Sequence, residues 1–429
     1  MRICIVGAGV TGLVAASMLV DKGHSVTVYE REKEPGGLAS TTTAGNERIE
    51  KFYHHIFTSD ANLIDLIDKL GLTSELMWLS PKNSIYINNH IYPFTSPMDL
   101  LMFKELPLHQ RILMGLLVYR AKLVSDWKKL ENINSKEWII KNAGQAVYDK
   151  VWGPLLNSKF DIDADKVSAV WIWNKFKLRG STRSKNLSGE LLGYMKGSFG
   201  KITEALVGKI TTAGSKVTSS CGVTKIGPNP DGTLSVTTSS GIETFDKVLV
   251  TAAPKILKHI TPAISGAYLE KLDKIKYKSN ICMMLELKKP VSSYYWTTIA
   301  DTKLPFVLFI EHSNLTPKGS YSSSVVYLSR YLDTDNPMFG WSDQEIEKSF
   351  IEGIKKMFPD FDESDIIDTH ITRAEFAQPV VVKEYSKIIP DYATPVDNLY
   401  LASMAQIYPE DRGLNYAVRM GESVGRILC

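Results

Sequence analysis

The sequence predicts an α/β fold with a discontinuous parallel-sheet domain and an inserted second domain that combines a mixed β-sheet with a helical cap. Three observations predict this fold. A strand, a glycine turn, a helix and a strand open the chain; a hairpin and a strand follow near its middle; and a strand, a loop and a helix end it. The 429 residues are enough for two or three interleaved domains.

The composition is that of an ordinary globular protein, with 44% hydrophobic and 23% charged residues. A net charge of +3 provides no strong field for nucleic acid, so we expect no nucleic-acid partner. The four cysteines form no CxxC pair, which is typical of a reducing compartment and predicts neither a metal site nor a redox dithiol. We therefore expect a cytoplasmic protein, and no sequence feature specifies its oligomeric state.

The amino-terminal stretch "ICIVGAGVTGLVAASMLV" predicts a strand over 3–7, a helix over 11–22 and, further on, a strand over 25–30. A signal peptide is the competing interpretation. It is disfavoured because Arg2 is the only basic residue before the apolar run, glycines interrupt that run, and no cleavage region follows.

This strand–turn–helix–strand context makes the GxGxxG pattern informative. Gly7 permits a tight turn, Gly9 lets the backbone approach a pyrophosphate, and Gly12 lets helix and strand pack closely. The helix amino end offers free N–H groups to phosphate. Glu30 ends the second strand, where a carboxylate can hold ribose hydroxyls. The segment is therefore predicted to bind a dinucleotide.

A second glycine pair, Gly36 and Gly37, follows the ribose-binding strand and precedes Leu38 and a Ser/Thr run. Here the chain resembles the flavin amine oxidase, protoporphyrinogen oxidase and phytoene desaturase superfamily, whose members place GGR or GGK at this point. Leu38 stands where many relatives have a basic residue. The resemblance implies FAD as the cofactor and a glutathione-reductase-type Rossmann FAD-binding domain.

The carboxyl end supports the resemblance. A strand over 399–403 and a helix over 414–428 match the superfamily's last strand and its final helix, whose amino end points at the flavin carbonyl. The usual Gly-Asp after that strand is replaced by Ser403 and Met404, so Asp411 is the candidate replacement for the missing carboxylate. In the middle of the chain, Val223 matches the valine that holds adenine through its backbone.

These matches predict a discontinuous FAD-binding domain over 1–55, 195–260 and 390–429, with a helical cap over 56–194 and a sheet-containing substrate domain over 261–389. The residues expected to contact FAD are Gly7, Ala8, Gly9, Thr11, Gly12, Glu30, Arg31, Gly36, Gly37, Leu38, Val223, Met404, Gly413, Leu414, Asn415 and Tyr416.

The stretch "YHHIFTSD" holds the first candidate catalytic residues. His55 resembles the first flavin-proximal histidine of the UDP-galactopyranose mutases, and Thr58 stands where their second would be. A histidine here could orient substrate or relay a proton, with His55 preferred over His54; structural packing is the alternative. Tyr53 is a candidate pocket residue.

Two further clusters supply candidates. Tyr295, Trp296 and His312 could form part of a pocket for a small-molecule substrate, although ordinary sheet packing is the favoured interpretation. Gln378 and Tyr385 lie where relatives place residues that face the flavin, and Tyr385 is a third candidate catalytic residue.

The basic and apolar segment 111–129 has two interpretations. It can be a cap helix packed on its own domain, which is the favoured one, or a helix that contacts a membrane surface and takes up a lipid substrate.

The leading function is an FAD-dependent oxidoreductase, amine oxidase- or desaturase-like, that takes a hydride from an organic substrate onto flavin N5. The first alternative is a redox-neutral sugar mutase resembling UDP-galactopyranose mutase. The second is a non-catalytic FAD-binding protein.

Overall fold

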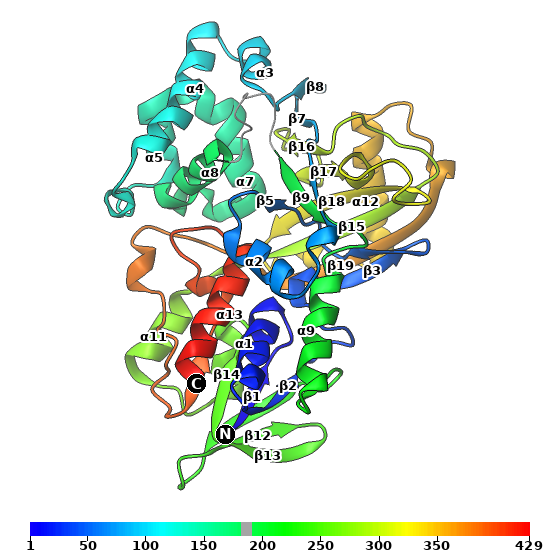
Figure 1. The fold of residues 1–429 in the computed structure, drawn as a ribbon. Helices are drawn as coiled ribbons and strands as arrows, with labels where there is room; N and C mark the ends of the chain where they lie inside the picture. Colours follow the sequence, from blue (N-terminus) through cyan, green and yellow to red (C-terminus); the bar gives the residue numbers. More distant parts are fainter. Residues whose placement is uncertain (182–190) are drawn as a thin grey trace.

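The computed structural model describes residues 1–181 and 191–429 (Figure 1). Residues 182–190, which belong to the predicted cap segment, lie outside the described residues.

A five-stranded parallel sheet forms the base of the first domain, in the order β10-β2-β1-β14-β20. Its strands are β1 (Arg2–Val6), β2 (Ser25–Tyr29), β10 (Lys216–Thr218), β14 (Lys247–Val250) and β20 (Leu399–Leu401). They come from all three segments that the sequence assigned to the FAD-binding domain. The central strands are buried on both faces, as their continuous apolar runs require.

Helices cover one face of this sheet and a small antiparallel sheet covers the other (Figure 1). The first face is covered by α1 (Val10–Asp21), α9 (Gly200–Thr212) and α13 (Leu414–Leu428). The second is covered by β11 (Val223–Pro228), β12 (Leu234–Thr238), β13 (Gly241–Phe245), α10 (Pro254–Ile260) and α11 (Gly266–Lys274). This layered arrangement is that of a Rossmann-type domain.

A seven-stranded mixed sheet forms the second domain, in the order β19-β15-β18-β17-β16-β7-β8. Its strands are β7 (Asn83–Ile87), β8 (His90–Pro93), β15 (Tyr277–Leu287), β16 (Trp296–Ile299), β17 (Leu308–Glu311), β18 (Ser324–Leu332) and β19 (Ile366–Pro379). Helix α12 (Asp343–Met357) packs on one face with an apolar core between them. The other face of the sheet packs against the first domain, with which it shares an apolar core.

The segment 56–194, expected to be a mostly helical cap, also contains five strands among its described residues. It contributes β5 (Ile56–Phe57), β6 (Leu76–Leu79) and β9 (Leu192–Met195), and its β7–β8 hairpin extends the seven-stranded sheet. The hairpin turn places Asn88 and Asn89 at φ 52° and 61°. Two positive-φ residues in a two-residue loop are the signature of a tight hairpin, and asparagine tolerates them well.

The helical cap packs around its own apolar core, separate from the cores of both sheets. Its helices are α3 (Pro97–Met102), α4 (Leu108–Leu123), α5 (Ser135–Ala143), α6 (Gln145–Val147), α7 (Gly153–Phe160) and α8 (Ala169–Ser181), with a π-helical turn over Tyr148–Trp152. Helix α2 (Ala61–Lys69) packs on α13 instead of joining the cap. A short hairpin pairs β3 (Thr41–Ala44) with β4 (Glu47–Glu50).

Short 3-10 turns occupy Gly37–Ala39, Thr73–Glu75, Trp127–Leu130, Asp161–Lys166, His312–Asn314, Pro337–Gly340, Glu363–Asp365, Tyr385–Lys387 and Met404–Gln406. No helix among the described residues combines the length and hydropathy that a bilayer-spanning segment needs.

Candidate functional site

The two glycine turns predicted from the sequence meet through their backbones. Gly9 and Gly36 form a parallel bridge, and the Gly36 N–H donates a 2.8 Å hydrogen bond to the Ala8 carbonyl. A Cβ on Gly37 would lie 3.3 Å from the Gly9 Cα. Gly7 needs its glycine because its φ is +105°. The turn therefore presents backbone, with little side-chain bulk, to a ligand.

Helices α1 and α13 run side by side in the same direction, with both amino ends at the carboxyl edge of the parallel sheet (Figure 1). Thr11 Oγ1 donates to the Ala417 carbonyl at 3.1 Å, so Thr11 ties the two helices together. Their N-caps are Gly9 and Gly413, and at neither end does a described side chain accept a capping hydrogen bond from the first-turn N–H groups. Two uncapped helix amino ends favour negative charge, which fits the diphosphate and ring carbonyls of FAD.

Glu30 lies at the end of β2, beside the first turn. Its carboxylate accepts hydrogen bonds from the Ala8 N–H at 2.7 Å and the Glu32 N–H at 2.9 Å. The Glu30 carbonyl accepts from the Cys221 N–H, which brings the start of β11 and Val223 to the same edge. Arg31 is exposed and pairs with Glu32, in contact range of Gly222. These residues fit the ribose and adenine of FAD.

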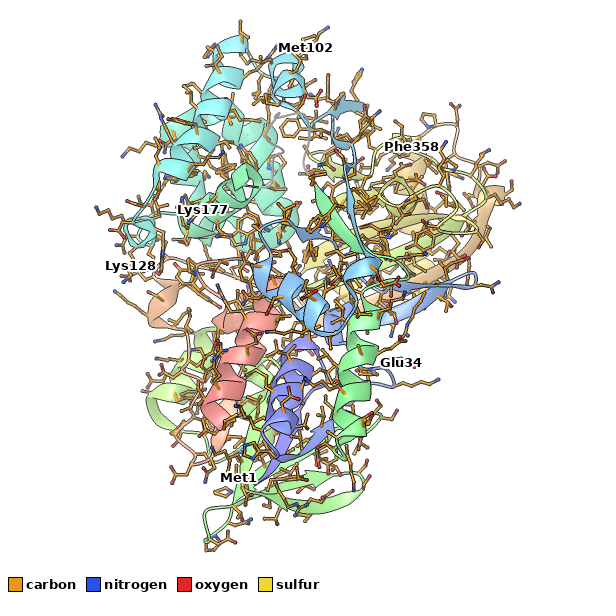
Figure 2. The ribbon with its side chains drawn as sticks, viewed as in Figure 1. Met1, Glu34, Met102, Lys128, Lys177 and Phe358 are labelled. Carbon is orange, nitrogen blue, oxygen red and sulfur yellow. The ribbon has the colours of Figure 1, made fainter. Side chains whose placement is uncertain are left out.

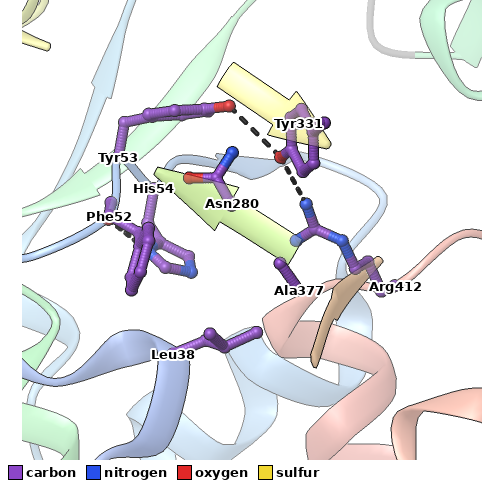
Figure 3. A pocket seen from close by; sticks show the side chains of 8 residues that line it. All are labelled: Leu38, Phe52, Tyr53, His54, Asn280, Tyr331, Ala377 and Arg412. Carbon is purple, nitrogen blue, oxygen red and sulfur yellow. Dashed lines mark hydrogen bonds between the residues drawn. The ribbon is translucent and has the colours of Figure 1, made fainter. Parts of the chain in front are cut away.

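A cavity opens where the two sheets meet, beyond the second glycine turn (Figure 3). Leu38 lies on one side of it, and Arg412 comes from the loop just before α13. The second domain contributes residues of β15, β18 and β19. The cavity is lined by Leu38, Phe52, Tyr53, His54, Asn280, Tyr331, Ala377 and Arg412.

Arg412 is the charged group of this cavity. Its Nη2 donates to the Tyr331 hydroxyl at 2.6 Å and its Nε donates to Gln378 Oε1 at 2.8 Å. The Tyr331 hydroxyl is also 3.4 Å from the Tyr53 hydroxyl, so these side chains form one chain of contacts (Figure 3). Gln378 thus positions Arg412 and is itself buried behind it.

His54 faces the cavity as a neutral imidazole. Burial, together with the positive charge of Arg412, lowers its pKa to about 4, although a hydrogen bond to the Phe52 carbonyl acts in the opposite direction. In the neutral ring Nδ1–H donates to the Phe52 carbonyl at 2.6 Å, which leaves Nε2 as an acceptor. The histidine preferred from the sequence, His55, instead lies 3.0 Å from the Tyr295 hydroxyl through Nδ1.

Asp411 does not serve as the replacement carboxylate toward the cofactor that the sequence suggested. It is buried and pairs with Lys175 at 2.5 Å and Lys159 at 3.3 Å, and it accepts from Gln378. Burial raises the pKa of Asp411, but the lysines outweigh this effect and hold the pKa well below its usual range. The carboxylate therefore interacts with side chains of the protein itself.

Two predicted site residues lie away from the cavity wall. His312 is fully buried below Tyr321, its Nε2 3.1 Å from that hydroxyl, because the chain turns away as β17 ends at Glu311. Tyr385 is buried in the cap core and donates to the Ala405 carbonyl at 3.0 Å. Neither belongs to the described lining of the cavity, so the structure does not bring them together with the other candidates, and their roles stay predictions.

The remaining predicted residues lie at β16, in the turn after β20 and at the start of α13. Tyr295 is fully buried, and the Trp296 ring packs edge-on against Tyr53 at 5.3 Å. Asn415 Oδ1 accepts from the Leu63 N–H and so joins α13 to α2. Tyr416 packs under the Arg419 guanidinium, next to Leu414 at the start of α13. Met404 follows β20 in a short turn that Ser403 caps.

Sequence reasoning missed most of the cavity wall contributed by the second domain. Asn280 was the detectable signal, because an amide in the apolar run of β15 needs a buried partner; its Nδ2 donates to Ser329 Oγ at 2.8 Å. Tyr331 lies opposite Asn280 in the β15–β18 pairing. Phe52, Ala377 and Arg412 carried no comparable signal.

The model for flavin-containing amine oxidoreductases matches residues 10–422 of this chain. The chain belongs to this family. It is therefore an FAD-dependent oxidoreductase, and the two-part fold and the cofactor expected from the sequence are confirmed.

Relatives of this chain include two 15-cis-phytoene desaturases. The Synechococcus elongatus enzyme is 22% identical and covers 94% of this chain and 90% of its own length. The Narcissus pseudonarcissus enzyme is 23% identical, and the match covers 94% of this chain and 75% of the length of that enzyme.

Solved structures of the same fold include a candidate protoporphyrinogen oxidase from Exiguobacterium sp. 255-15. It has a TM-score of 0.78 at 17% identity and covers 100% of this chain and 98% of its own. Cyclohexylamine oxidase from Brevibacterium oxydans has a TM-score of 0.74 at 14% identity, with coverage of 100% and 98%.

Proposed function

We propose that this enzyme oxidises an organic substrate that is uncharged at its reacting carbon, by transfer of a hydride from a C–H bond at the cavity of Leu38, His54 and Arg412. FAD, when bound, supplies the hydride acceptor. The chain's own contribution is to bind and orient the substrate and to control charge around it.

The observation that supports this choice is the charge of the cavity. Arg412 is a guanidinium, His54 is neutral near pH 7, and the described lining includes no carboxylate. Bringing a protonated amine beside a buried guanidinium is unfavourable, because like charges repel strongly where water is excluded. A neutral C–C bond meets no such penalty.

The names of relatives support this substrate class. Two of the relatives that match 94% of the chain are named 15-cis-phytoene desaturases, and their substrate name denotes a hydrocarbon. We therefore infer that the reaction is dehydrogenation of a C–C bond in an apolar, unsaturated substrate. We favour this reaction over oxidation of an amine.

Three groups would act on the bound substrate and cofactor. His54 Nε2, which carries no proton in the neutral ring, would accept the proton that the adjacent carbon loses as the hydride leaves and the C=C bond forms. Arg412, together with the amino end of α13, would stabilise negative charge that develops next to it. The paired hydroxyls of Tyr53 and Tyr331 would hold Arg412 in place.

The test is anaerobic mixing of the FAD-loaded protein with a candidate substrate. Loss of the flavin absorbance measures the reduction. We expect reduction by a detergent-dispersed polyene and none by putrescine or cyclohexylamine. Reduction by the amines alone would overturn the proposed substrate class. Turnover of a UDP-sugar only after dithionite treatment would support the mutase alternative. A protein that does not retain FAD and shows no reaction would support neither enzyme.

Two neighbouring histidines provide matched variants for the same assay. His54→Gln removes the basic imidazole nitrogen at the cavity wall, because an amide does not take up a proton, and we expect a fall of about tenfold or more in the reduction rate. His55→Gln alters a residue that contacts Tyr295 and Trp296 behind the wall, so we expect a smaller loss. Equal effects would remove His54 from its proposed role.

A further inference from the structure

The cap carries an exposed apolar surface along one side of α3 and α4. Among the described residues, fifteen large apolar side chains are exposed, and eight of them fall between residues 98 and 123. Their exposed fractions run from 41% to 64%. We call this set the cap patch; its members are Met98, Leu101, Met102, Leu108, Ile112, Leu116, Tyr119 and Leu123.

The spacing of the cap patch shows that it is one continuous stripe on α4. Residues 108, 112, 116, 119 and 123 follow each other at steps of three or four, so they share one helix face. The opposite face packs inward through Met114, Leu117 and Ala121. The packing interpretation from the sequence thus accounts for only one of the two apolar faces of α4.

Helix α3 adds exposed apolar side chains next to the stripe on α4. Met98, Leu101 and Met102 are exposed on a helix that packs against α4, where Leu100 approaches Gly115. Both helices lie at the end of the cap far from the two chain termini, and Met102 lies at the outer edge of the molecule (Figures 1 and 2). A flat surface could meet the cap patch without touching the FAD-binding domain.

Basic side chains accompany the patch. Residues 97–130 contain six lysines and arginines against three acidic residues. Two of the three acids are already used: Asp99 caps α3, and Glu105 accepts hydrogen bonds from Asn88 and Tyr92. Lys104, Arg120 and Lys122 are exposed beside the apolar stripe. Their long side chains can reach phosphate groups while the stripe is buried.

We propose that the cap patch binds the surface of a bilayer that contains anionic lipids. A stripe about 24 Å long on a 16-residue helix, flanked by lysine and arginine, is the pattern of a helix lying in the lipid headgroup region. A convex helix surface of Met, Leu, Ile and Tyr inserts among acyl chains, and the basic side chains meet lipid phosphates. This inference does not depend on the proposed substrate.

The test is flotation of the FAD-loaded, full-length protein with vesicles. We expect binding to phosphatidylcholine vesicles that contain about a quarter phosphatidylglycerol, weaker binding at high salt, and little binding to phosphatidylcholine alone. The Ile112→Glu/Leu123→Glu variant should bind at least tenfold less, while keeping its flavin spectrum. Arg120→Gln/Lys122→Gln should lower binding and reduce its salt dependence.

Matched controls separate the cap patch from apolar exposure in general. Ile242 and Ile367 are 70% and 54% exposed on β13 and β19, far from the cap helices in the chain and in different elements. Ile242→Glu/Ile367→Glu should bind vesicles like the unaltered protein. No flotation of the unaltered protein, or equal loss in both double variants, would overturn the proposal. Self-association abolished by Ile112→Glu/Leu123→Glu, without vesicle binding, would instead assign the patch to a second copy of the chain.

Discussion

The guanidinium of Arg412 donates a 2.6 Å hydrogen bond to the hydroxyl of Tyr331. This bond joins the loop before α13, in the FAD-binding domain, to strand β18 of the second sheet. The contact is also part of the cavity wall, so the charge of the site depends on how the two domains dock (Figure 3).

Replacing Arg412 should slow catalysis without removing the cofactor. Arg412→Met leaves no positive charge beside the developing negative charge, and we expect the rate of anaerobic flavin reduction to fall by about 10–100-fold. Arg412→Lys should recover part of this loss, because it keeps the charge but not the two directed hydrogen bonds. Stopped-flow absorbance measures both rates.

Arg419 provides the control for that substitution. Arg419 lies on α13, pairs with Glu410 in the loop before that helix, and is outside the described cavity wall. In Arg419→Met the flavin should therefore be reduced at close to the original rate. A loss of rate as large as that of Arg412→Met would show that the effect of Arg412→Met is not local.

Glu30→Ala should weaken FAD binding. The buried carboxylate stands where ribose hydroxyls are expected, and its removal also leaves the Ala8 N–H without its acceptor. We expect the dissociation constant for FAD to rise at least about tenfold, measured by ultrafiltration and flavin fluorescence. Glu32→Ala, at an exposed neighbour, should change it little; equal effects would argue against Glu30 as a ribose ligand.

Gly421→Ala should destabilise the interface of α1 and α13. A Cβ at Gly421 would lie 2.6 Å from the Thr11 carbonyl oxygen and 2.8 Å from Val14 Cβ, so the helices would have to separate. We expect a loss of about 1–3 kcal/mol in the free energy of unfolding, measured by urea denaturation. Gly208→Ala is the control, because Gly208 lies in α9 with nothing within 4 Å of the new Cβ. It should be neutral or slightly stabilising.

His312 should make stability depend on pH. Burial lowers the pKa of His312 to about 3, whereas a histidine in the unfolded chain titrates near 6.5. Below about pH 6.5 the unfolded state therefore binds more protons, and the free energy of unfolding falls as the pH falls. Between about pH 7 and about pH 5 we expect the original protein to lose about 2 kcal/mol more than His312→Gln. Urea denaturation at both pH values measures the difference, and equal slopes would contradict it.

The local elements of the first domain were predictable because their causes are local. Helix α13 has the boundaries inferred from its apolar spacing and Gly413, and α1 begins one residue before its predicted start. The β7–β8 hairpin was not recognised. Its turn uses Asn88 and Asn89 in place of an Asn-Gly pair, and its strand β7 pairs with β16, which lies more than 200 residues later in the chain.

The candidate site was predictable only in part. Leu38, Tyr53 and His54 follow from motifs near the amino end, and all three line the cavity. Between the adjacent residues His54 and His55, the sequence offers no basis for deciding which one faces inward. That choice depends on β5, which begins at Ile56 and pairs with β9, a strand that begins at Leu192.

The dinucleotide unit and the family could be inferred from sequence alone, because glycine turns, strand runs and helix starts act over a few neighbouring residues. The chemistry of the cavity, in contrast, depends on tertiary contacts. His54, Asn280, Tyr331 and Arg412 come from four separate stretches of chain, and burial among them sets the neutral state of His54 beside the charged Arg412. The same holds for the cap patch, since exposure depends on which face of α4 the cap core covers.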